Sequence, residues 1–362
     1  MKKIYIFAAL LLAAVSCTNR LDYHSGQPEK LLVLNSVMRT DESLHRVNVW
    51  LSTLRESPKY LTDAKVDIYI NGGYLGEAVF YDRQNYPGFP KNDYFGMAKM
   101  QFGAGFFFEA TLSQGDEIRI EASWEELRAS ATVTVPPAVE LVSLDTLSVD
   151  ENPYSEGMRA LECKLRMRDV PGQDNWMRLV VEQHCDVVSH HGNDPSNDTL
   201  RTWFTLPATI YFDDDEVLRD CFHSSREQDA LHQTDLNLPL VTNEYCIFTD
   251  REFRDSDYTA DVYLNDASIY TPYPAPWPTD VNSSLTFKLL TISQDDYLYH
   301  RAYTNEKHNI LGTGTAAKIL CEPVTYPVNV EGGLGFVCVQ AVSKATLDFS
   351  EKMDAMPEEG LF

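Results

Sequence analysis

The strongest constraint on this chain is a repeated alternation of apolar and polar residues, the pattern of β-strands with one buried face. The segment 46–51, with the sequence RVNVWL, shows it clearly. The pattern predicts a mostly β protein. The same alternation occurs at 65–70, 117–121, 131–135, 161–167, 177–181, 260–264, 285–289 and 337–341.

Turn and linker signals divide these strands. Asn71-Gly72-Gly73 follows a strand and adopts positive φ angles easily, so it predicts a β-hairpin. Pro136-Pro137 cannot donate to a sheet ladder and favours an extended linker, so we place a domain boundary there. With 362 residues and ~150 residues per domain, two domains are expected. We assign 28–138 to a first β domain, 139–350 to a second and 351–362 to a C-terminal tail.

One segment of the second domain carries helix signals. Ser293 can cap a helix whose third residue is Asp296, an acid at the positive end of the helix dipole. Gly312 is a stop signal. We therefore expect one helix near 294–310, appended to the β domain. Three of its aromatic side chains are expected to pack rather than to bind a ligand: Tyr297, Tyr299 and Tyr303.

The first residues predict export and lipid attachment. The apolar run over 4–15 follows a short basic start and is shorter than the ~20 residues of a membrane-spanning helix. Ala14-Val15-Ser16-Cys17 resembles a bacterial lipobox. We therefore expect a signal peptide over 1–16, acylation of Cys17 and a lipidated tether over 17–27. The alternative is an ordinary secretory signal with an incidental cysteine.

The net charge excludes one class of partner. Asp and Glu number 54 against 30 Lys and Arg, so the formal charge is −24. Such a surface repels phosphate backbones, and no cluster of Lys or Arg offsets it, so no nucleic-acid partner is expected. The same charge keeps the folded body away from anionic head groups, which makes acylated Cys17 the expected contact with membrane lipid.

Several segments carry a family resemblance. They are FTDREFRDSDYTADVYLNDA (248–267), LLTISQDDYLYHRAY (289–303) and EPVTYPVNVEGGLGFV (322–337), with the early strands at 31–52 and 61–72. Together they resemble an uncharacterised family of Bacteroidota outer-membrane lipoproteins, catalogued as domain of unknown function four-two-four-nine. The resemblance implies an N-terminal immunoglobulin-like or transthyretin-like β-sandwich, followed by a larger β module with the appended helix. It also implies a cell-envelope lipoprotein, often encoded with TonB-dependent outer-membrane transporters, and no established catalytic residues.

The glycine-rich part of the last segment has a structural interpretation. Gly332, Gly333 and Gly335 are followed neither by Lys-Ser/Thr nor by helical sequence, so a phosphate-binding loop is disfavoured. The glycines instead predict a tight bend between strands near Val328 and Val337.

Six cysteines follow Cys17, and an even number in an exported chain allows up to three disulfides. The absence of C-x-x-C spacing argues against a zinc ribbon or a thioredoxin-like motif. Cys163 and Cys185 are predicted on the apolar sides of adjacent strands, where a bridge and two inert thiols are both open. The candidates for disulfides are Cys163, Cys185, Cys221, Cys246, Cys321 and Cys338.

Two aromatic, proline-rich stretches are candidate binding surfaces. One is 270–278, with the sequence YTPYPAPWP, and the other surrounds Pro87-Gly88 in the first domain. Rings on proline-stiffened loops suit stacking on a sugar or docking on a partner protein. In the alternative interpretation, the rings cover the edges of the core. The candidate surface residues are Tyr270, Tyr273, Trp277, Tyr86 and Phe89.

Metal and catalytic motifs are weak. The contiguous acids Asp213 to Glu216 lack the alternation of a calcium loop, and His190-His191 with Asp194 lacks the spacing of a zinc motif. No G-x-S-x-G or Cys–His signature occurs, so we assign no catalytic residue, metal or cofactor. Thr199 and Thr146 lie in Asp-Thr-Leu triplets that resemble an O-glycosylation signal of Bacteroidota envelopes, with Thr199 favoured by its polar loop.

Together these observations predict a non-enzymatic cell-envelope lipoprotein that binds a ligand or partner, as an accessory to a TonB-dependent outer-membrane transporter. It is expected to be anchored by lipid in the outer membrane, facing either side. The alternatives are a structural or adhesive surface lipoprotein and, behind that, a hydrolase.

Overall fold

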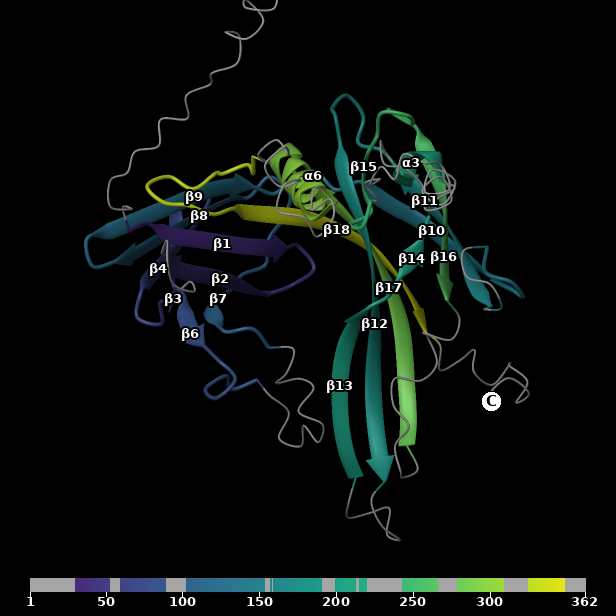
Figure 1. Ribbon diagram of the computed structural model, residues 1–362, viewed down its shortest axis with the longest axis horizontal. Helices are drawn as coiled ribbons and strands as arrows, with labels where there is room; N and C mark the ends of the chain where they lie inside the picture. Colours follow the sequence, from purple (N-terminus) through teal and green to yellow (C-terminus); the bar gives the residue numbers. More distant parts are fainter. Residues whose placement is uncertain are drawn as a thin grey trace, which may run out of the picture.

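The computed structural model describes residues 30–52, 59–88, 102–153, 157, 159–190, 199–212, 215–219, 243–265, 279–308 and 325–348. In this part of the chain the protein is mostly β, with strands in three sheets and two short helices (Figure 1). The mostly β class expected from the alternating pattern is confirmed.

The first strands are β1 (Leu32–Arg39), β2 (Leu44–Leu51), β3 (Lys59–Tyr60), β4 (Lys65–Ile70), β5 (Gly73–Glu77), β6 (Val79–Tyr81), β7 (Gly105–Glu109), β8 (Glu117–Trp124) and β9 (Leu127–Thr134). The later strands are β10 (Glu140–Val149), β11 (Ala160–Arg168), β12 (Trp176–His190), β13 (Thr199–Pro207), β14 (Ile210–Tyr211), β15 (Ile247–Thr249), β16 (Asp257–Asn265), β17 (Thr279–Ile292) and β18 (Val337–Asp348). The helices are α3 (Glu216–Arg219) and α6 (Gln294–His308).

One large sheet runs through the whole molecule. Its order is β13-β12-β17-β18-β1-β2-β7-β6, with β15 added beside β12 and β3 beside β2. The pairing of β1 with β18 is parallel and sets Met38 opposite Val339, whereas β18 pairs antiparallel with β17. Two smaller sheets have the orders β5-β4-β8-β9 and β10-β11-β16-β14.

The first core lies between the β5-β4-β8-β9 sheet and the β18-β1-β2-β7 part of the large sheet. Leu34, Ile68 and Ile120 are fully buried there, and Val339 of the last strand joins them. Apolar side chains of alternating strand positions supply this core, which is the arrangement of a β-sandwich.

The second core lies between the β10-β11-β16-β14 sheet and strands β12 and β17 of the large sheet. Val262 and Phe287 are fully buried in it. The proline pair separates the two cores along the chain, because Val135 packs in the first core and Val139 in the second.

Both small sheets cover the same face of the large sheet. In β18, Ala341 packs in the first core and Ala345 packs against the second, and residues four apart in a strand share a face. The stretch 325–341, which the sequence places in a second domain, therefore contributes Val330, Val337 and Val339 to the first core. The two cores are separate in the middle of the chain and joined by its last strand.

The predicted hairpin after β4 is present. Asn71 and Gly72 have φ angles of 51° and 75°, and β4 pairs antiparallel with β5 across them.

The predicted bend at the glycines is also present, and it joins two sheets. Glu331 bridges to Ser130 of β9, and Leu334 bridges to Val33 of β1. Gly335 has a φ of 114°, and a Cβ there would collide with the carbonyl oxygen of Leu34. A strand near Val328 was expected and is wrong, because 325–330 contain no regular element.

The helix near 294–310 is present as α6, and the hydroxyl oxygen of Ser293 accepts a hydrogen bond of 3.1 Å from the amide of Asp296. Tyr297 is buried, and Tyr299 stacks on Phe336 with 4.9 Å between ring centroids. Tyr303 is 46% exposed, and its ring contacts that of Tyr245 edge-on with 5.8 Å between centroids. All three tyrosines thus pack against neighbours, and Tyr303 does so least completely.

The predicted adjacency of the strands that carry Cys163 and Cys185 is wrong. β11 pairs with β10 and β16, whereas β12 pairs with β13, β15 and β17 of the other sheet. The crossing between sheets is fixed by Asn175, whose side-chain amide donates to Asp169 Oδ1 at 2.8 Å and to Asp250 Oδ2 at 3.0 Å.

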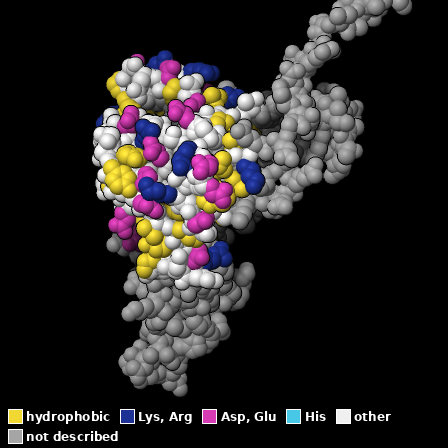
Figure 2. Space-filling view, turned by 90° about the vertical axis from the view of Figure 1, so that its left-hand side faces the viewer, with side chains coloured by type: hydrophobic (Ala, Val, Ile, Leu, Met, Phe, Trp, Pro, Cys, Tyr) yellow, Lys and Arg dark blue, Asp and Glu magenta, His cyan; other side chains and the backbone are white. Residues whose placement is uncertain are grey.

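The surface of the described part mixes both signs of charge. Figure 2 shows Lys and Arg side chains interleaved with Asp and Glu on the side that it presents, between separate hydrophobic patches. On the outer face of the β10-β11-β16-β14 sheet, Lys164 pairs with Asp261 and Arg166 with Asp257. No helix among the described residues has the length and apolar character needed to cross a membrane.

Candidate functional site

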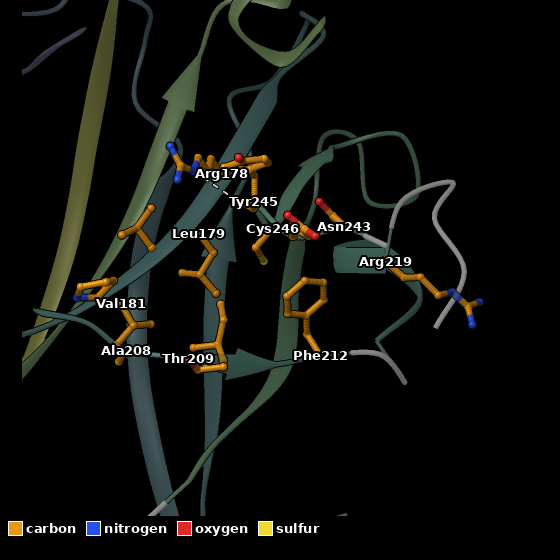
Figure 3. Close-up of a pocket in the computed structure, with 14 residues that line it drawn as sticks. Arg178, Leu179, Val181, Ala208, Thr209, Phe212, Arg219, Asn243, Tyr245 and Cys246 are labelled. Atoms are coloured by element: carbon orange, nitrogen blue, oxygen red, sulfur yellow. Dashed lines mark hydrogen bonds between the residues drawn. The ribbon is translucent and has the colours of Figure 1, made fainter. Parts of the chain in front are cut away.

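A hollow of about 470 Å³ lies beside β12 (Figure 3). Its walls come from Leu179 and Val181 of β12, from the segment 207–212, and from the turn 243–246. This volume is in the range of small-molecule sites. In Figure 3 the side chains of Leu179, Phe212 and Cys246 converge on it, whereas that of Arg219 extends away.

The cavity exists because β12 changes its pairing partner at this point. On this edge β12 pairs with β15 from Trp176 to Arg178, and with β13 from Glu182 onward. Leu179 to Val181 lie between the two partners and have register partners only in β17. Single backbone hydrogen bonds cover this stretch instead of a strand: the amide of Leu179 donates to the carbonyl oxygen of Cys246 at 2.9 Å, and the amide of Ala208 donates to the carbonyl oxygen of Val181 at 2.8 Å.

Most of the cavity wall is apolar, and Arg178 and Tyr245 lie together at one end of it. Arg178 donates from Nε to the carbonyl oxygen of Tyr245 at 3.2 Å, and its guanidinium lies 5.4 Å from the Tyr245 ring centroid. Burial lowers the pKa of Arg178, as does the nearby Arg39. Asn243 is buried and uses its amide on the backbone of Leu218 and Ile247. The site therefore suits a ligand with a large apolar part.

Cys246 is the thiol in the cavity wall, and it is not a nucleophile in this state. Burial raises the pKa of Cys246, and the neighbouring Asp215 carboxylate raises it further. Because the reactive form of cysteine is the thiolate, a thiol held protonated at neutral pH is inert.

Behind Arg178, on the face of the large sheet that carries α6, lies a buried polar network. Its members are Arg178, His300, Asp296, Gln340, Arg39, Glu182, Lys288 and Asp41.

At the α6 end of the polar network, Arg178 Nη1 lies 3.1 Å from His300 Nε2. A guanidinium only donates, so Nε2 accepts and Nδ1 of His300 carries the proton. Nδ1 lies 2.9 Å from the carbonyl oxygen of Asp296 and 3.1 Å from its Oδ1. Burial acts to raise the pKa of Asp296, but hydrogen bonds from His300 and Gln340 outweigh it and the pKa lies below its usual value.

At the other end, Lys288 Nζ lies 2.8 Å from Glu182 Oε2 and 3.0 Å from Asp41 Oδ2. Arg39 donates to Glu182 at 3.1 Å and to Gln340 Oε1 at 3.3 Å, which links the two ends. Lys288 and Arg39 face carboxylates, and Arg178 is held by His300 and the carbonyl oxygen of Tyr245, so the polar network fixes α6 and four strands to one another. Asp41 Oδ1 is buried and has no hydrogen-bond partner among the described residues.

Most residues proposed from the sequence lie outside the described part of the chain or away from the cavity. Tyr86 is described: it stacks on Phe102 with 4.4 Å between ring centroids and also contacts Tyr81 and Phe107. Thr146 lies in β10. The loop expected around Thr199 is wrong at that residue, because Thr199 begins β13 and pairs with His190 of β12. The proposed residues outside the described ranges are Cys17, Phe89, Cys221, Tyr270, Tyr273, Trp277 and Cys321.

The other four cysteines, Cys163, Cys185, Cys246 and Cys338, are buried thiols that form no disulfide. Of the two interpretations left open for Cys163 and Cys185, the structure has inert buried thiols, since the two residues lie in different sheets.

In the acidic run, Asp215 is a helix cap rather than a metal ligand. Its Oδ1 accepts from the amides of Val217 at 3.0 Å and Leu218 at 2.8 Å, and its Oδ2 accepts from that of Asp261 at 3.1 Å. Burial raises the pKa of Asp215 in spite of these bonds. Within the described residues no group of three or more His, Cys, Asp or Glu side chains is arranged to hold a metal ion.

The sequence did not indicate the cavity or the polar network. Arg178, Tyr245 and His300 carry no motif, and the first two are brought together by the switch of partner along β12. A weak signal was available in β17, where Lys288 interrupts an apolar run between Phe287 and Leu289.

A family model described as "Domain of unknown function (DUF4249)" matches residues 18–346. No curated protein matches the chain.

Among solved structures, a crystal structure of Parabacteroides merdae β-glucuronidase is similar with a TM-score of 0.19 and 10% identity, over 72% of this chain and 24% of that one. The apo structure of Bacteroides uniformis β-glucuronidase 3 gives 0.18 and 10%, over 73% and 25%. The chain thus spans about a quarter of the length of these two enzymes.

Proposed function

Because the chain belongs to the DUF4249 family, we propose that it is a non-enzymatic binding lipoprotein of the cell envelope. In this proposal acylated Cys17 anchors the protein in the outer membrane, and the folded β part of the chain binds a small ligand. The protein serves as an accessory to a TonB-dependent outer-membrane transporter. The two β-sandwich cores correspond to an immunoglobulin-like or transthyretin-like first module and a larger second module with α6.

The cavity beside β12 is the observation that carries the proposal. Its volume of about 470 Å³ fits a small molecule. Its apolar walls from Leu179, Val181 and Phe212 would bury the body of a ligand, with Tyr245 at the polar end. The protonated state of Cys246 supports binding over covalent catalysis at this wall.

A cavity-filling substitution tests the proposal. Ala208 lies at the cavity wall in Figure 3 and is half-buried, so Ala208→Trp places an indole in the cavity. With anilinonaphthalene sulfonate as the probe, we expect saturable fluorescence enhancement by the native protein and at least about tenfold weaker binding by the variant.

Ala138→Trp is the matched control, because Ala138 is exposed in the linker between the two cores. It should bind the probe as the native protein does. Equal binding by Ala208→Trp and the native protein, with both folded by circular dichroism, would refute the cavity as the site.

The transporter part of the proposal requires a separate test. The full chain, purified from solubilised outer membrane through an affinity tag, should retain a β-barrel transporter in stoichiometric amount. If no barrel is retained while Ala208→Trp still impairs probe binding, the protein binds a ligand without a transporter. If neither holds, the structural or adhesive alternative is favoured.

A further inference from the structure

A second surface of different chemistry lies on the outer face of β2, opposite the first core. Val47, Val49 and Leu51 point into that core and are at most 6% exposed. Arg46 and Asn48 therefore point to the other face, as strand geometry requires. We call the set Arg46, Asn48, Trp50 and Tyr60 the β2 patch.

The polar groups of the β2 patch are unusual in having no partners. Arg46 is exposed and Asn48 is half-buried, and the side chain of neither has a hydrogen-bond or ion-pair partner. The indole N–H of Trp50 is buried with no acceptor. All three absences of a partner hold among the residues that the structure describes. An unpaired buried donor costs about 1–3 kcal/mol, so the indole N–H of Trp50 calls for an explanation, whereas water solvates the exposed guanidinium of Arg46.

Two glycines make room for the Arg46 side chain. A Cβ on Gly105 would lie 2.8 Å from Arg46 Cγ and 3.1 Å from Asn48 Oδ1. A Cβ on Gly103 would collide with Arg46 Nη1. The guanidinium is thus laid along the strand over two positions without side chains, beside the Asn48 amide.

Aromatic rings flank this arrangement on both sides. Trp50 and Tyr60 are stacked with 5.1 Å between centroids and 16° between planes, and Tyr60 is 50% exposed. On the other side Phe107 stands opposite Arg46 in β7, and its ring stacks on Phe102 with 5.2 Å between centroids. The β2 patch therefore combines one cation, one amide and apolar rings.

We propose that the β2 patch binds the free C-terminal end of a short peptide. The guanidinium of Arg46 pairs with the terminal carboxylate, since arginine presents parallel donors that match two carboxylate oxygens. The Asn48 amide, one donor group and one acceptor, pairs with the carbonyl oxygen and the N–H of one residue of the extended peptide, since these two groups point to the same side. Tyr60 and Trp50 pack against an apolar side chain of the peptide.

Arg46 supplies a local positive charge that favours an anionic end group at this place, against the net charge of −24. The chain carries 54 acidic side chains, and none of the described ones is paired with Arg46. The general negative field is screened within about 8 Å at physiological ionic strength, so the local cation decides what binds. The proposal does not depend on the cavity beside β12, which lies in the second half of the molecule.

A pair of peptide mixtures tests the proposal. The probes are tetrapeptides of randomised sequence with free C-termini and the same mixture with amidated C-termini, which differs by one charge. Retention on the immobilised mature protein is measured by mass spectrometry at 0.15 M salt. The free mixture should be retained at least about tenfold more than the amidated one, because an ionic hydrogen bond is lost on amidation.

Variants locate the binding. Arg46→Gln should abolish the preference for free C-termini, and Gly105→Ala should reduce it by displacing Arg46. Arg251→Gln is the matched control, since Arg251 is an exposed arginine at a distant turn. Equal retention of both mixtures, no retention of either, or a preference that survives Arg46→Gln would overturn the proposal. An Ala208→Trp variant with an unchanged peptide preference shows that the two sites are separate.

Discussion

The two faces of β17 bury their side chains in different ways. Phe287 is fully buried in the second core, among apolar side chains of both sheets. Lys288, the next residue, points to the opposite face, is 9% exposed and lies between the carboxylates of Glu182 and Asp41. One residue of shift along the strand thus separates an apolar core from a buried ionic network.

The difference shows what each kind of burial can specify. Apolar contacts are non-directional and stabilise any arrangement that excludes water. The polar network works only with particular partners at particular distances, as between Arg178, His300 and Asp296. The apolar face therefore supplies stability, and the polar face fixes where α6 sits.

The largest effect is expected from breaking the apolar face. Phe287→Ala should lower the free energy of unfolding by about 4 kcal/mol, since it leaves a cavity in a packed core. Urea unfolding measures this, and the loss should be the same at pH 5 and pH 8 because no charge is involved. A loss below about 1 kcal/mol would mean that the second core is not packed as described.

A smaller loss is expected from the other face. Lys288→Met should cost about 3 kcal/mol, since it leaves Asp41 and Glu182 buried without their shared cation. Adding Glu182→Gln should recover part of this loss in a double-mutant cycle. Two additive losses would contradict the polar network.

The pH profile of Lys288→Met adds a second readout. Burial acts to lower the pKa of Lys288, but hydrogen bonds to Glu182 and Asp41 outweigh it and the pKa is raised above 10.5. Its contribution is therefore complete below pH 10.5 and lost as the pH rises through the folded pKa. The native protein should lose stability in that alkaline range, and Lys288→Met should lose less.

The smallest effect is expected at His45, a buried titratable residue of β2. Burial lowers the pKa of His45, opposed by the hydrogen bond from its Nε2 to the carbonyl oxygen of Ala110 at 3.0 Å. The unfolded chain takes up the proton first, so this contribution is present above pH 6.5 and is lost as the pH falls below it. His45→Gln should flatten the fall in melting temperature between pH 7 and pH 5.

His184→Gln is the control for that experiment, because His184 is exposed on β12. It should keep the native dependence on pH. Identical slopes for the native protein and His45→Gln would show that His45 is not buried as a neutral group.

Local features of the fold could be read from the sequence because their causes are local. The alternation of apolar and polar residues predicted the strands, Asn71 and Gly72 predicted the hairpin, and Ser293 predicted the start of α6. Partners of strands could not be read in this way. Nothing near Val337 indicates that it will lie beside Ser36, some 300 residues away, and so the shared sheet was missed.

The candidate sites depended on the same missing information. The cavity arises where β12 exchanges β15 for β13, which no single segment encodes. The β2 patch needs Gly103 and Gly105 beside Arg46, a neighbourhood created by pairing of β2 with β7. Tyr86 was singled out by its prolines, and the structure packs it in an aromatic cluster at the edge of the same face.

The parallel pairing of β1 with β18 has a consequence for how the chain acquires its structure. β1 cannot complete its sheet until β18 has been synthesised, so the first core stays open during most of synthesis. Such long-range closure slows folding, because the entropy of a loop of some 300 residues is lost before the contacts form. The opening strands of the described part therefore reach their final pairing only after β18 is available.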